Sequence, residues 1–431
     1  MEKILEELYL TIKTIKDNII FLEPILNNNI SQTNIKITNT EWALKRAQEI
    51  TNIIKSCQAN NTLNEEELAK ITEEIIEKLI QSGQAEMLNE NKIKLKMSAS
   101  PISKKNIDKL IREMQSIERR NELIYQNSLI NLVTTYERAM AKIITTYYVK
   151  NNESLGPDKT IKLYEVKKMN SISEIVNYLI MNEVKDLMHR GVKEWHDFIK
   201  KKFCSPLYYY NNNRKVIEEI FERRNLFIHN DGIINEIYYN KFKDDNDIHI
   251  GQKRNASKDY IFDSANILLH DYIDIVLSFI DYNNRALIET LFTIGFEEMC
   301  EKNYLIAYEI FSFLDNNDNE IEANKCLYKI NKWICCKSIS DLNGYLREID
   351  EYDYSNQSVE LQLGIEAIKM DKERIRALVN KVNISQLSDE EISTWPVFQW
   401  IREDEDFYAE ILKLIRDKLT FQKDDFAPIS R

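Results

Sequence analysis

Residues 213–232 read NRKVIEEIFERRNLFIHNDG. Apolar side chains recur in this stretch at helical spacing, with Glu and Arg between them, which predicts an amphipathic helix packed along one side. The recurring residues are Ile217, Ile220, Phe221, Phe227 and Ile228. Asn230, Asp231 and Gly232 predict the end of the helix, because glycine readily takes the left-handed conformation that closes a helix.

Three residues just before this end have side chains suited to chemistry on a phosphate. Asn225 and His229 are four residues apart and share a helix face, and Arg224 lies beside them with a side chain long enough to reach round. A histidine in the last turn can give or take a proton near neutral pH, and a guanidinium can bind a phosphate with two hydrogen bonds. The trio therefore suits cleavage of RNA by its own 2′-hydroxyl without a metal. The alternative is a helix-end histidine bonded to a carbonyl beside a surface arginine.

The composition predicts an all-α protein. The chain has 431 residues, 43% of them hydrophobic, and contains only 8 Gly and 6 Pro. Long segments rich in Leu, Ile, Lys and Glu dominate, and these residues favour helices. The length indicates two to three domains with real hydrophobic cores.

The motif carries a family resemblance. Arg224-Asn-Leu-Phe-Ile-His229-Asn-Asp-Gly232, followed by Asn235 and Tyr238, resembles the RN-x-x-x-H-N-x-G-x-x-N-x-x-Y run of the HEPN superfamily. These helical ribonucleases and nucleotide-binding domains occur in bacterial abortive-infection and toxin systems. The resemblance implies that His229 is the acid–base residue, Arg224 the phosphate clamp and Asn225 the residue that orients them. Some members carry Tyr two residues after the histidine for nucleotide addition, and Asp231 stands there in this chain.

Three regions are expected. For residues 1–100 we expect a helical region with a possible short hairpin. Its strands would be the alternating segments Lys92–Met97 and Asn34–Thr38. For residues 101–283 we expect a HEPN-like helical bundle. In the bundle we expect helices at Ile107–Lys150, with a break near Asn121, and at Ile172–Met188, Gly191–Phe203, the motif helix and Ile261–Phe279.

Residues 284–431 predict helix pairs of an α-solenoid-like, tetratricopeptide-like region, a candidate surface for a protein regulator. Tyr304–Phe311 followed by Ala323 resembles a degenerate tetratricopeptide repeat, in which small residues let helices approach. The expected helices are Arg285–Lys302, Tyr304–Leu314, Glu320–Cys336, Ser340–Ile349, Ser358–Met370, Lys372–Val382 and Asp406–Leu419.

Charge is distributed unevenly along the chain. The net charge is −12, and from residue 284 onward there are 18 Lys and Arg against 29 Asp and Glu, which makes that region a poor nucleic-acid binder. Residues 185–215 are basic, with aromatic residues interleaved, and form a candidate RNA-binding patch. Its candidate RNA contacts are Lys193, Lys200, Lys201, Lys202 and Arg214. The alternative is a solvated helix face above core aromatics.

Other patterns exclude several classes of site. The six cysteines show no C-x-x-C spacing and predict buried or inert thiols in a reducing compartment. His189 and His196 are seven apart with no third ligand in register, so neither a metal nor another cofactor is expected, and His270 is expected to be exposed. No apolar run approaches eighteen residues and no signal peptide opens the chain, which predicts a cytoplasmic protein without membrane contact.

Three functional hypotheses follow. The first is a metal-independent endoribonuclease that cleaves RNA by 2′-hydroxyl transesterification, as a toxin or antiviral abortive-infection effector. The resemblance implies a homodimer through the bundle, because two copies double the groups available to one phosphate. The second is a non-catalytic HEPN-like scaffold that binds RNA, a nucleotide or a protein. The third is a toxin held inactive by a partner.

Overall fold

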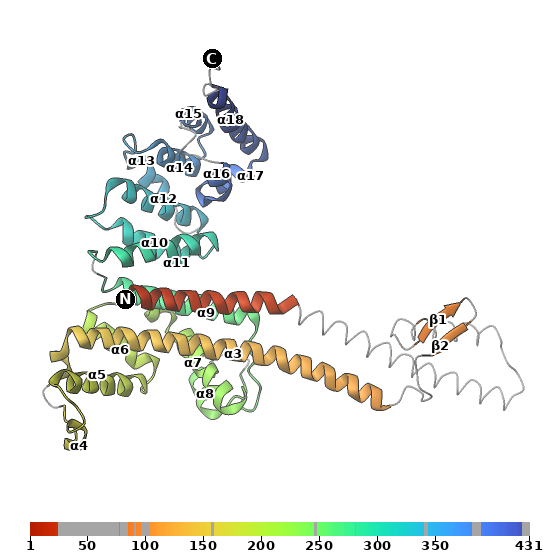
Figure 1. Cartoon of the computed structure of the whole chain (residues 1–431), viewed down its shortest axis with the longest axis vertical. Helices are drawn as coiled ribbons and strands as arrows, with labels where there is room; N and C mark the ends of the chain where they lie inside the picture. The colour runs from red at the N-terminus through yellow and green to blue at the C-terminus, as the bar shows by residue number, and fades with distance from the viewer. Residues whose placement is uncertain are drawn as a thin grey trace, which may run out of the picture. The chain divides into compact units, whose positions relative to one another are not determined.

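The computed structural model describes residues 1–24, 77, 85–89, 92–95, 104–156, 159–244, 248–280, 282–339, 344–381 and 389–424. In this part of the chain the fold is all-α apart from one short hairpin, as the composition predicts (Figure 1). Residues 2–24 form the N-terminal helix. One apolar stripe of this helix is buried throughout: Leu5, Leu8, Ile12, Ile15 and Ile19.

The chain divides into two compact units. The motif unit contains Ile12–Val133 and Glu222–Asp263, and the helical unit contains Met1–Thr11, Thr134–Phe221 and Ser264–Arg431. Helices α3 (Lys104–Lys150), α7 (Tyr208–Asn230) and α9 (Lys258–Leu277) each contribute residues to both units. The three sequential regions expected from the sequence stay a prediction. The two compact units do not correspond to them one to one, because each unit is built from separate segments of the chain.

Helix α3 is continuous over 47 residues. The predicted break near Asn121 is wrong, since neither Gly nor Pro interrupts the segment and its charged residues there are good helix formers. The apolar stripe of its second half is buried at Leu129, Val133, Tyr136, Met140 and Ile144, whereas Tyr147 is half-buried.

The motif unit contains the hairpin and a short helix beyond the motif. Strand β1 (Ala85–Asn89) pairs antiparallel with β2 (Lys92–Leu95), with Ala85 opposite Leu95. The strand predicted at Lys92 is therefore present, but its partner in the structure is β1. The segment 34–38, predicted as its partner, lies outside the described residues. Helix α8 (Glu236–Phe242) packs a small core of Leu226, Ile234, Tyr238, Phe242 and Ile248.

The helical unit begins with the second half of α3 and the helices that follow it. After the 3-10 turn η1 (Asn152–Leu155) come α4 (Leu163–Val166), α5 (Ile172–Met188) and α6 (Val192–Phe203). The predicted bounds of α5 are confirmed, and those of α6 differ by one residue. Ser171 starts α5 as its N-cap, because its hydroxyl accepts a hydrogen bond from the Glu174 amide at 3.1 Å.

A buried polar network joins the helices of this unit. His196 on α6 is fully buried, with Nε2 2.8 Å from Asp271 Oδ2 on α9 and Nδ1 2.7 Å from the Val192 carbonyl oxygen. The Tyr136 hydroxyl donates to the same Asp271 oxygen, and the Tyr210 ring stacks on His196 with ring centroids 3.6 Å apart. Because a carbonyl only accepts, Nδ1 carries a proton, and His196 and Asp271 hold one further proton between them. His196 is thus a structural residue of the core.

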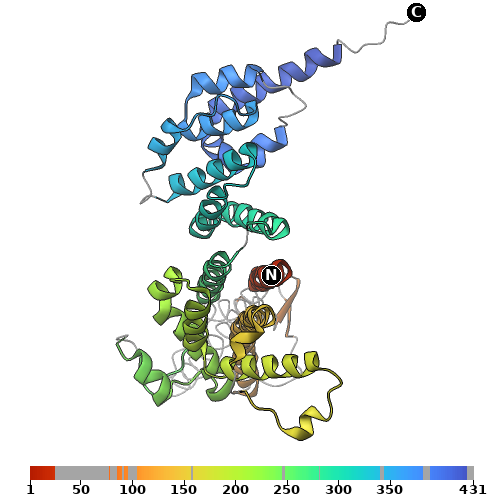
Figure 2. The same cartoon turned by 90° about the vertical axis from the view of Figure 1, so that its left-hand side faces the viewer.

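Residues 284–424 of the helical unit form successive helices that pack against one another in sequence (Figures 1 and 2). The predicted helices are present within a few residues at each end, and α16, η2 and α17 are additional. The elements are α10 (Arg285–Cys300), α11 (Tyr304–Asp315), α12 (Glu322–Ser338), α13 (Tyr345–Glu351), α14 (Val359–Lys369), α15 (Lys372–Lys381), α16 (Asp389–Thr394), η2 (Pro396–Phe398), α17 (Gln399–Glu403) and α18 (Glu405–Asp424).

Small residues allow close contact between α10 and α11. Ala307 is fully buried, as the repeat-like pattern predicts, whereas Ala323 is exposed. The closest approach is at Gly295 on α10, where a Cβ atom would lie 3.0 Å from Ile310 Cγ2 and 3.2 Å from Phe311 Cζ. A larger residue at Gly295 would separate the two helices.

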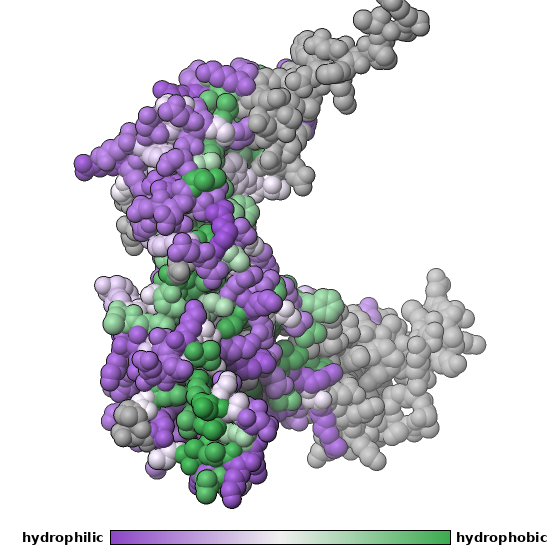
Figure 3. Space-filling view, turned by 60° about the vertical axis from the view of Figure 1, so that its left-hand side comes forward, coloured by the Kyte–Doolittle hydropathy of each residue, from purple (hydrophilic) through white to green (hydrophobic). Residues whose placement is uncertain are grey.

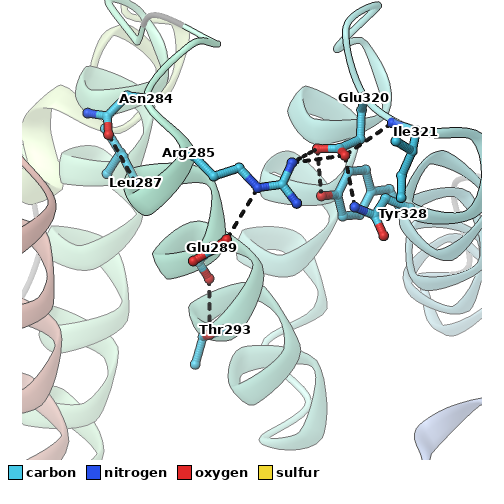
Figure 4. Close-up of polar contacts among 9 residues, drawn as sticks. Asn284, Arg285, Leu287, Glu289, Thr293, Glu320, Ile321 and Tyr328 are labelled. Atoms are coloured by element: carbon cyan, nitrogen blue, oxygen red, sulfur yellow. Dashed lines mark hydrogen bonds and ion pairs between the residues drawn. The ribbon is translucent and has the colours of Figure 1, made fainter.

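A buried carboxylate fixes the start of α10 to the segment before α12. The Arg285 guanidinium bonds both oxygens of Glu320 at 3.0 Å, and Asn324 and Tyr328 donate to the same carboxylate at 2.8 and 3.4 Å (Figure 4). The Glu320 side chain is only 1% exposed. Its burial alone would raise the pKa of Glu320, but the hydrogen bonds from Asn324 and Arg285 outweigh burial and lower that pKa.

Some apolar and thiol side chains are exposed. Ile172 and Met181 on α5 are 80% and 68% exposed, and hydrophobic residues gather in a strip on the face drawn in Figure 3. Cys326, Cys335 and Cys336 are buried as predicted, but Cys204 and Cys300 are exposed. Cys57 lies outside the described residues.

Candidate active site

The motif helix ends as the sequence predicts. α7 extends to Asn230, and its last turn contains His229. Asp231 (φ +47°) and Gly232 (φ +79°) both take the left-handed conformation, and the Gly232 amide donates to the Leu226 carbonyl at 3.0 Å. The Asn230 side-chain amide donates to the Ile233 carbonyl at 2.5 Å. These bonds satisfy groups that a helix end otherwise leaves unpaired.

A short antiparallel pairing holds the chain beyond the helix. The Arg254 amide donates to the Gly232 carbonyl at 2.7 Å, and Ile233 and Lys253 form a bridge. A Cβ atom at Gly232 would lie 3.1 Å from the Arg254 carbonyl oxygen and 3.2 Å from the Phe227 ring. Only glycine therefore fits this position without displacement, which explains the glycine that follows the motif.

The three predicted catalytic residues lie together in the last two turns of α7. His229 is exposed, and Arg224 and Asn225 are half-buried. The Asn225 Nδ2 atom is 3.5 Å from Glu222 Oε2, the outer limit of a hydrogen bond, and Glu222 also pairs with Lys241 on α8. The site thus contains an accessible imidazole one helical turn from a polar amide, with the guanidinium adjacent in sequence.

The neighbouring arginine has a different environment. Arg223 is 6% exposed, its guanidinium stacks 3.6 Å from the centre of the Tyr260 ring, and Nη1 donates to the Asn255 carbonyl at 3.1 Å. Arg223 therefore fixes α7 to the segment before α9. Of the two consecutive arginines, only Arg224 belongs to the motif.

Ion pairs with α3 hold the end of the motif helix, and the sequence gives no sign of them. Arg119 donates to Asp231 at 2.8 Å and to Glu122 at 2.7 Å, and Lys253 pairs with Glu122 at 2.6 Å. The hydrogen bond from Arg119 lowers the pKa of Asp231. Arg119 is 112 residues from Asp231, so no local pattern relates them. Asp231 serves here as an anchor for the turn after His229.

The later residues of the resemblance have structural roles. The Asn235 side chain caps α8 by accepting from the Tyr238 amide at 2.9 Å. The Tyr238 ring is buried in the small core with Leu226 and Phe242. The residues after His229 in the resemblance are therefore explained by chain geometry.

Four isoleucines of the motif unit are exposed. Three lie within or just after the motif in sequence, and the fourth lies shortly before Lys253, which forms the bridge with Ile233. Ile228, Ile233, Ile237 and Ile250 are 46%, 40%, 64% and 56% exposed. Such side chains usually pack inside a protein or against a partner.

The predicted RNA-binding residues belong to the helical unit. Three of them contact neighbouring side chains, and the other two are exposed. Lys200 bonds Asn211 and lies 5.0 Å from the centre of the Tyr210 ring, Lys202 lies 6.0 Å from the Tyr147 ring, and Arg214 pairs with Glu218 at 2.7 Å. Lys193 and Lys201 are exposed. Of the interleaved aromatics, Trp195 and Tyr210 are buried and Tyr208 is 72% exposed. The alternative interpretation, in which the interleaved aromatic residues belong to the core, is thus confirmed for Trp195 and Tyr210.

The predicted exposure of His270 is wrong. Its side chain is 12% exposed, pairs with Glu309 on α11 at 2.5 Å, and packs on the Tyr209 ring with centroids 3.8 Å apart. Within the described ranges, no group of three His, Cys, Asp or Glu residues is arranged to hold a metal ion. No helix in the same ranges has the length and apolarity needed to cross a membrane.

Comparison with known proteins yields no match to a family model, a curated protein or a solved structure.

Proposed function

We propose that the protein is a metal-independent endoribonuclease of the HEPN type, in which His229, Arg224 and Asn225 act on one phosphodiester. The observation that carries the proposal is the environment of His229. It is exposed in the last turn of α7, while the residues on either side of the motif are fixed by core packing, left-handed turns and ion pairs. A free imidazole on a rigid support is what proton transfer to a bound substrate requires.

In the proposed reaction the ribose 2′-oxygen attacks the adjacent phosphorus. His229 accepts the 2′-hydroxyl proton, the bond from phosphorus to the 5′-oxygen breaks, and that oxygen leaves with a proton from a second imidazole. Arg224 stabilises the additional negative charge on the phosphoryl oxygens, and Asn225 orients the phosphate. The products are a 2′,3′-cyclic phosphate and a 5′-hydroxyl.

The second imidazole would come from a second copy of the chain. One copy offers a single His229, whereas base and acid act on opposite sides of the phosphorus. A twofold dimer supplies both. The exposed isoleucines Ile228, Ile233, Ile237 and Ile250 give that contact its apolar surface. This assembly could serve as a toxin or an abortive-infection effector, with a regulator bound to α10–α18.

The decisive experiment compares two histidine variants on RNA in EDTA. His229→Ala should lower cleavage by about 100- to 10,000-fold, the usual contribution of a general acid–base residue. His249→Ala is the matched control, because His249 is also exposed in the motif unit and lies outside the motif. Cleavage products should carry a cyclic phosphate.

Equal cleavage by wild type and His229→Ala would reject the catalytic assignment. RNA binding by the wild type without any cleavage would identify the non-catalytic scaffold instead. Arg224→Gln separates the nuclease from the scaffold further. Only the nuclease predicts that this variant loses more in cleavage rate than in RNA affinity. Arg120→Gln, at an exposed position on α3, is its control.

A further inference from the structure

A cavity of about 440 Å³ lies in the helical unit, whereas Arg224, Asn225 and His229 belong to the motif unit. Residues from the start of α7, from α9, from the turn before α11 and from the end of α12 line it. They include Tyr209, Asn266, His270, Lys302, Tyr304 and Leu305. Its volume is within the range of about 300–1,000 Å³ that small-molecule sites occupy.

One wall of the cavity is aromatic and polar. The His270 ring packs against Tyr209 and is oriented by its ion pair with Glu309. Next to it, Asn266 donates to Asn303 Oδ1 at 3.4 Å, and Asn303 donates to the buried carboxylate of Glu298 at 2.8 Å. Planar rings beside fixed amides suit a flat heteroaromatic ligand, which stacks on the rings and bonds the amides along its edge.

Lys302, which also lines the cavity, carries a positive charge. Lys302 is exposed, takes a left-handed conformation (φ +66°), and directly precedes the first turn of α11. The carboxylates near the cavity, Glu309 and Glu298, contact His270 and Asn303. The lining thus contains a cation that attracts an anion and aromatic rings that attract a planar ligand.

We propose that this cavity binds a nucleoside 5′-monophosphate, with the base against Tyr209, His270 and Asn266 and the phosphate at Lys302. This ligand combines a planar hydrogen-bonding ring, which suits the rings and amides of the lining, with a single anionic group, which suits Lys302. The site is distinct from Arg224, Asn225 and His229, so it stands whether or not the protein cleaves RNA.

Isothermal titration of the full chain tests the proposal with AMP, adenosine and ribose 5-phosphate. AMP should bind saturably, and adenosine about three- to five-fold more weakly, as expected for loss of one exposed ion pair. Ribose 5-phosphate, which has no base, should show no saturable binding. Lys302→Gln should reduce AMP affinity to that of adenosine, whereas Lys413→Gln on α18 should not change it.

A steric variant provides the second test. Leu305 is 59% exposed and lines the cavity, so Leu305→Trp should block AMP binding without unfolding the chain. Leu346→Trp is its control, because Leu346 on α13 is 49% exposed and is not part of the lining. Absence of AMP binding to the wild type would overturn the proposal. So would equal binding of ribose 5-phosphate, or equal loss in both tryptophan variants. Cleavage activity of the same samples is measured separately and decides nothing about this site.

Discussion

The turn after His229 can be tested by comparing two glycines of the motif unit. Gly232 and Gly251 both have positive φ, at +79° and +85°. A Cβ atom at Gly232 would meet the Arg254 carbonyl oxygen at 3.1 Å and the Phe227 ring at 3.2 Å, whereas at Gly251 it would meet nothing within 4 Å. Replacing each glycine by alanine therefore separates the cost of the backbone conformation from the cost of crowding.

The magnitudes follow from these two terms. An alanine in the left-handed region costs about 1–2 kcal/mol, and both variants incur this cost. Gly232→Ala adds overpacking against a backbone oxygen and a buried ring, which costs about 1–3 kcal/mol more. For a domain of about 150–250 residues, each kcal/mol lowers the melting temperature by about 2–4 °C. Gly232→Ala should therefore melt about 2–12 °C below Gly251→Ala.

Thermal unfolding by circular dichroism measures the difference, and hydrogen exchange locates it. The Arg254 amide, which donates to the Gly232 carbonyl, should exchange faster in Gly232→Ala than in Gly251→Ala. Equal melting temperatures and equal exchange at Arg254 would refute the account of this turn. If the proposed nuclease assignment is right, Gly232→Ala should also lose RNA cleavage, because the turn fixes the helix end that carries His229.

Two further variants test the contacts around the motif and the buried carboxyl of α9. Arg119→Gln should leave the melting temperature nearly unchanged, as for exposed ion pairs, yet reduce RNA cleavage several-fold by releasing Asp231. Arg347→Gln, which also breaks an exposed pair, on α13, should leave both the melting temperature and cleavage of the same RNA nearly unchanged. Burial, with a smaller contribution from nearby Glu309, raises the pKa of Asp274 to about 6 from an ordinary 3.8. The folded state thus favours the neutral carboxyl, so stability falls as pH rises from about 4 through 6. Asp274→Asn should melt above the wild type at pH 7 and level with it at pH 4, and an unchanged difference between the two pH values would contradict the burial argument.

Most helices could be predicted from the chain because their determinants are local. Apolar spacing, the absence of Gly and Pro, and capping residues such as Ser171 and Asn235 act within a few residues. The prediction of a break near Asn121 was wrong because a run of polar residues in a long helix resembles a helix boundary. No Gly or Pro lies in that run to interrupt the helix. The pairing of β2 with β1 was not predicted, since alternation predicts a strand and leaves its pairing undefined.

The candidate site was predictable only in part. Arg224, Asn225 and His229 are close in sequence, and helix geometry alone brings them together. Arg119 and Lys253 could not be found this way, because their contacts depend on how α3 and the segment after α8 pack beside the motif helix.

The sequence by itself determined the helices, the end of the motif helix and the three residues it presents, because hydrogen bonds between near neighbours govern these features. Tertiary structure alone decided which histidines are available. The sequence placed His196 seven residues from His189 without a third ligand and predicted an exposed His270, yet packing gives His196 an Asp271 partner and His270 a Glu309 partner from distant helices. His229 remains exposed. A side chain's surroundings depend on contacts between segments far apart in the chain, and local spacing carries no record of them.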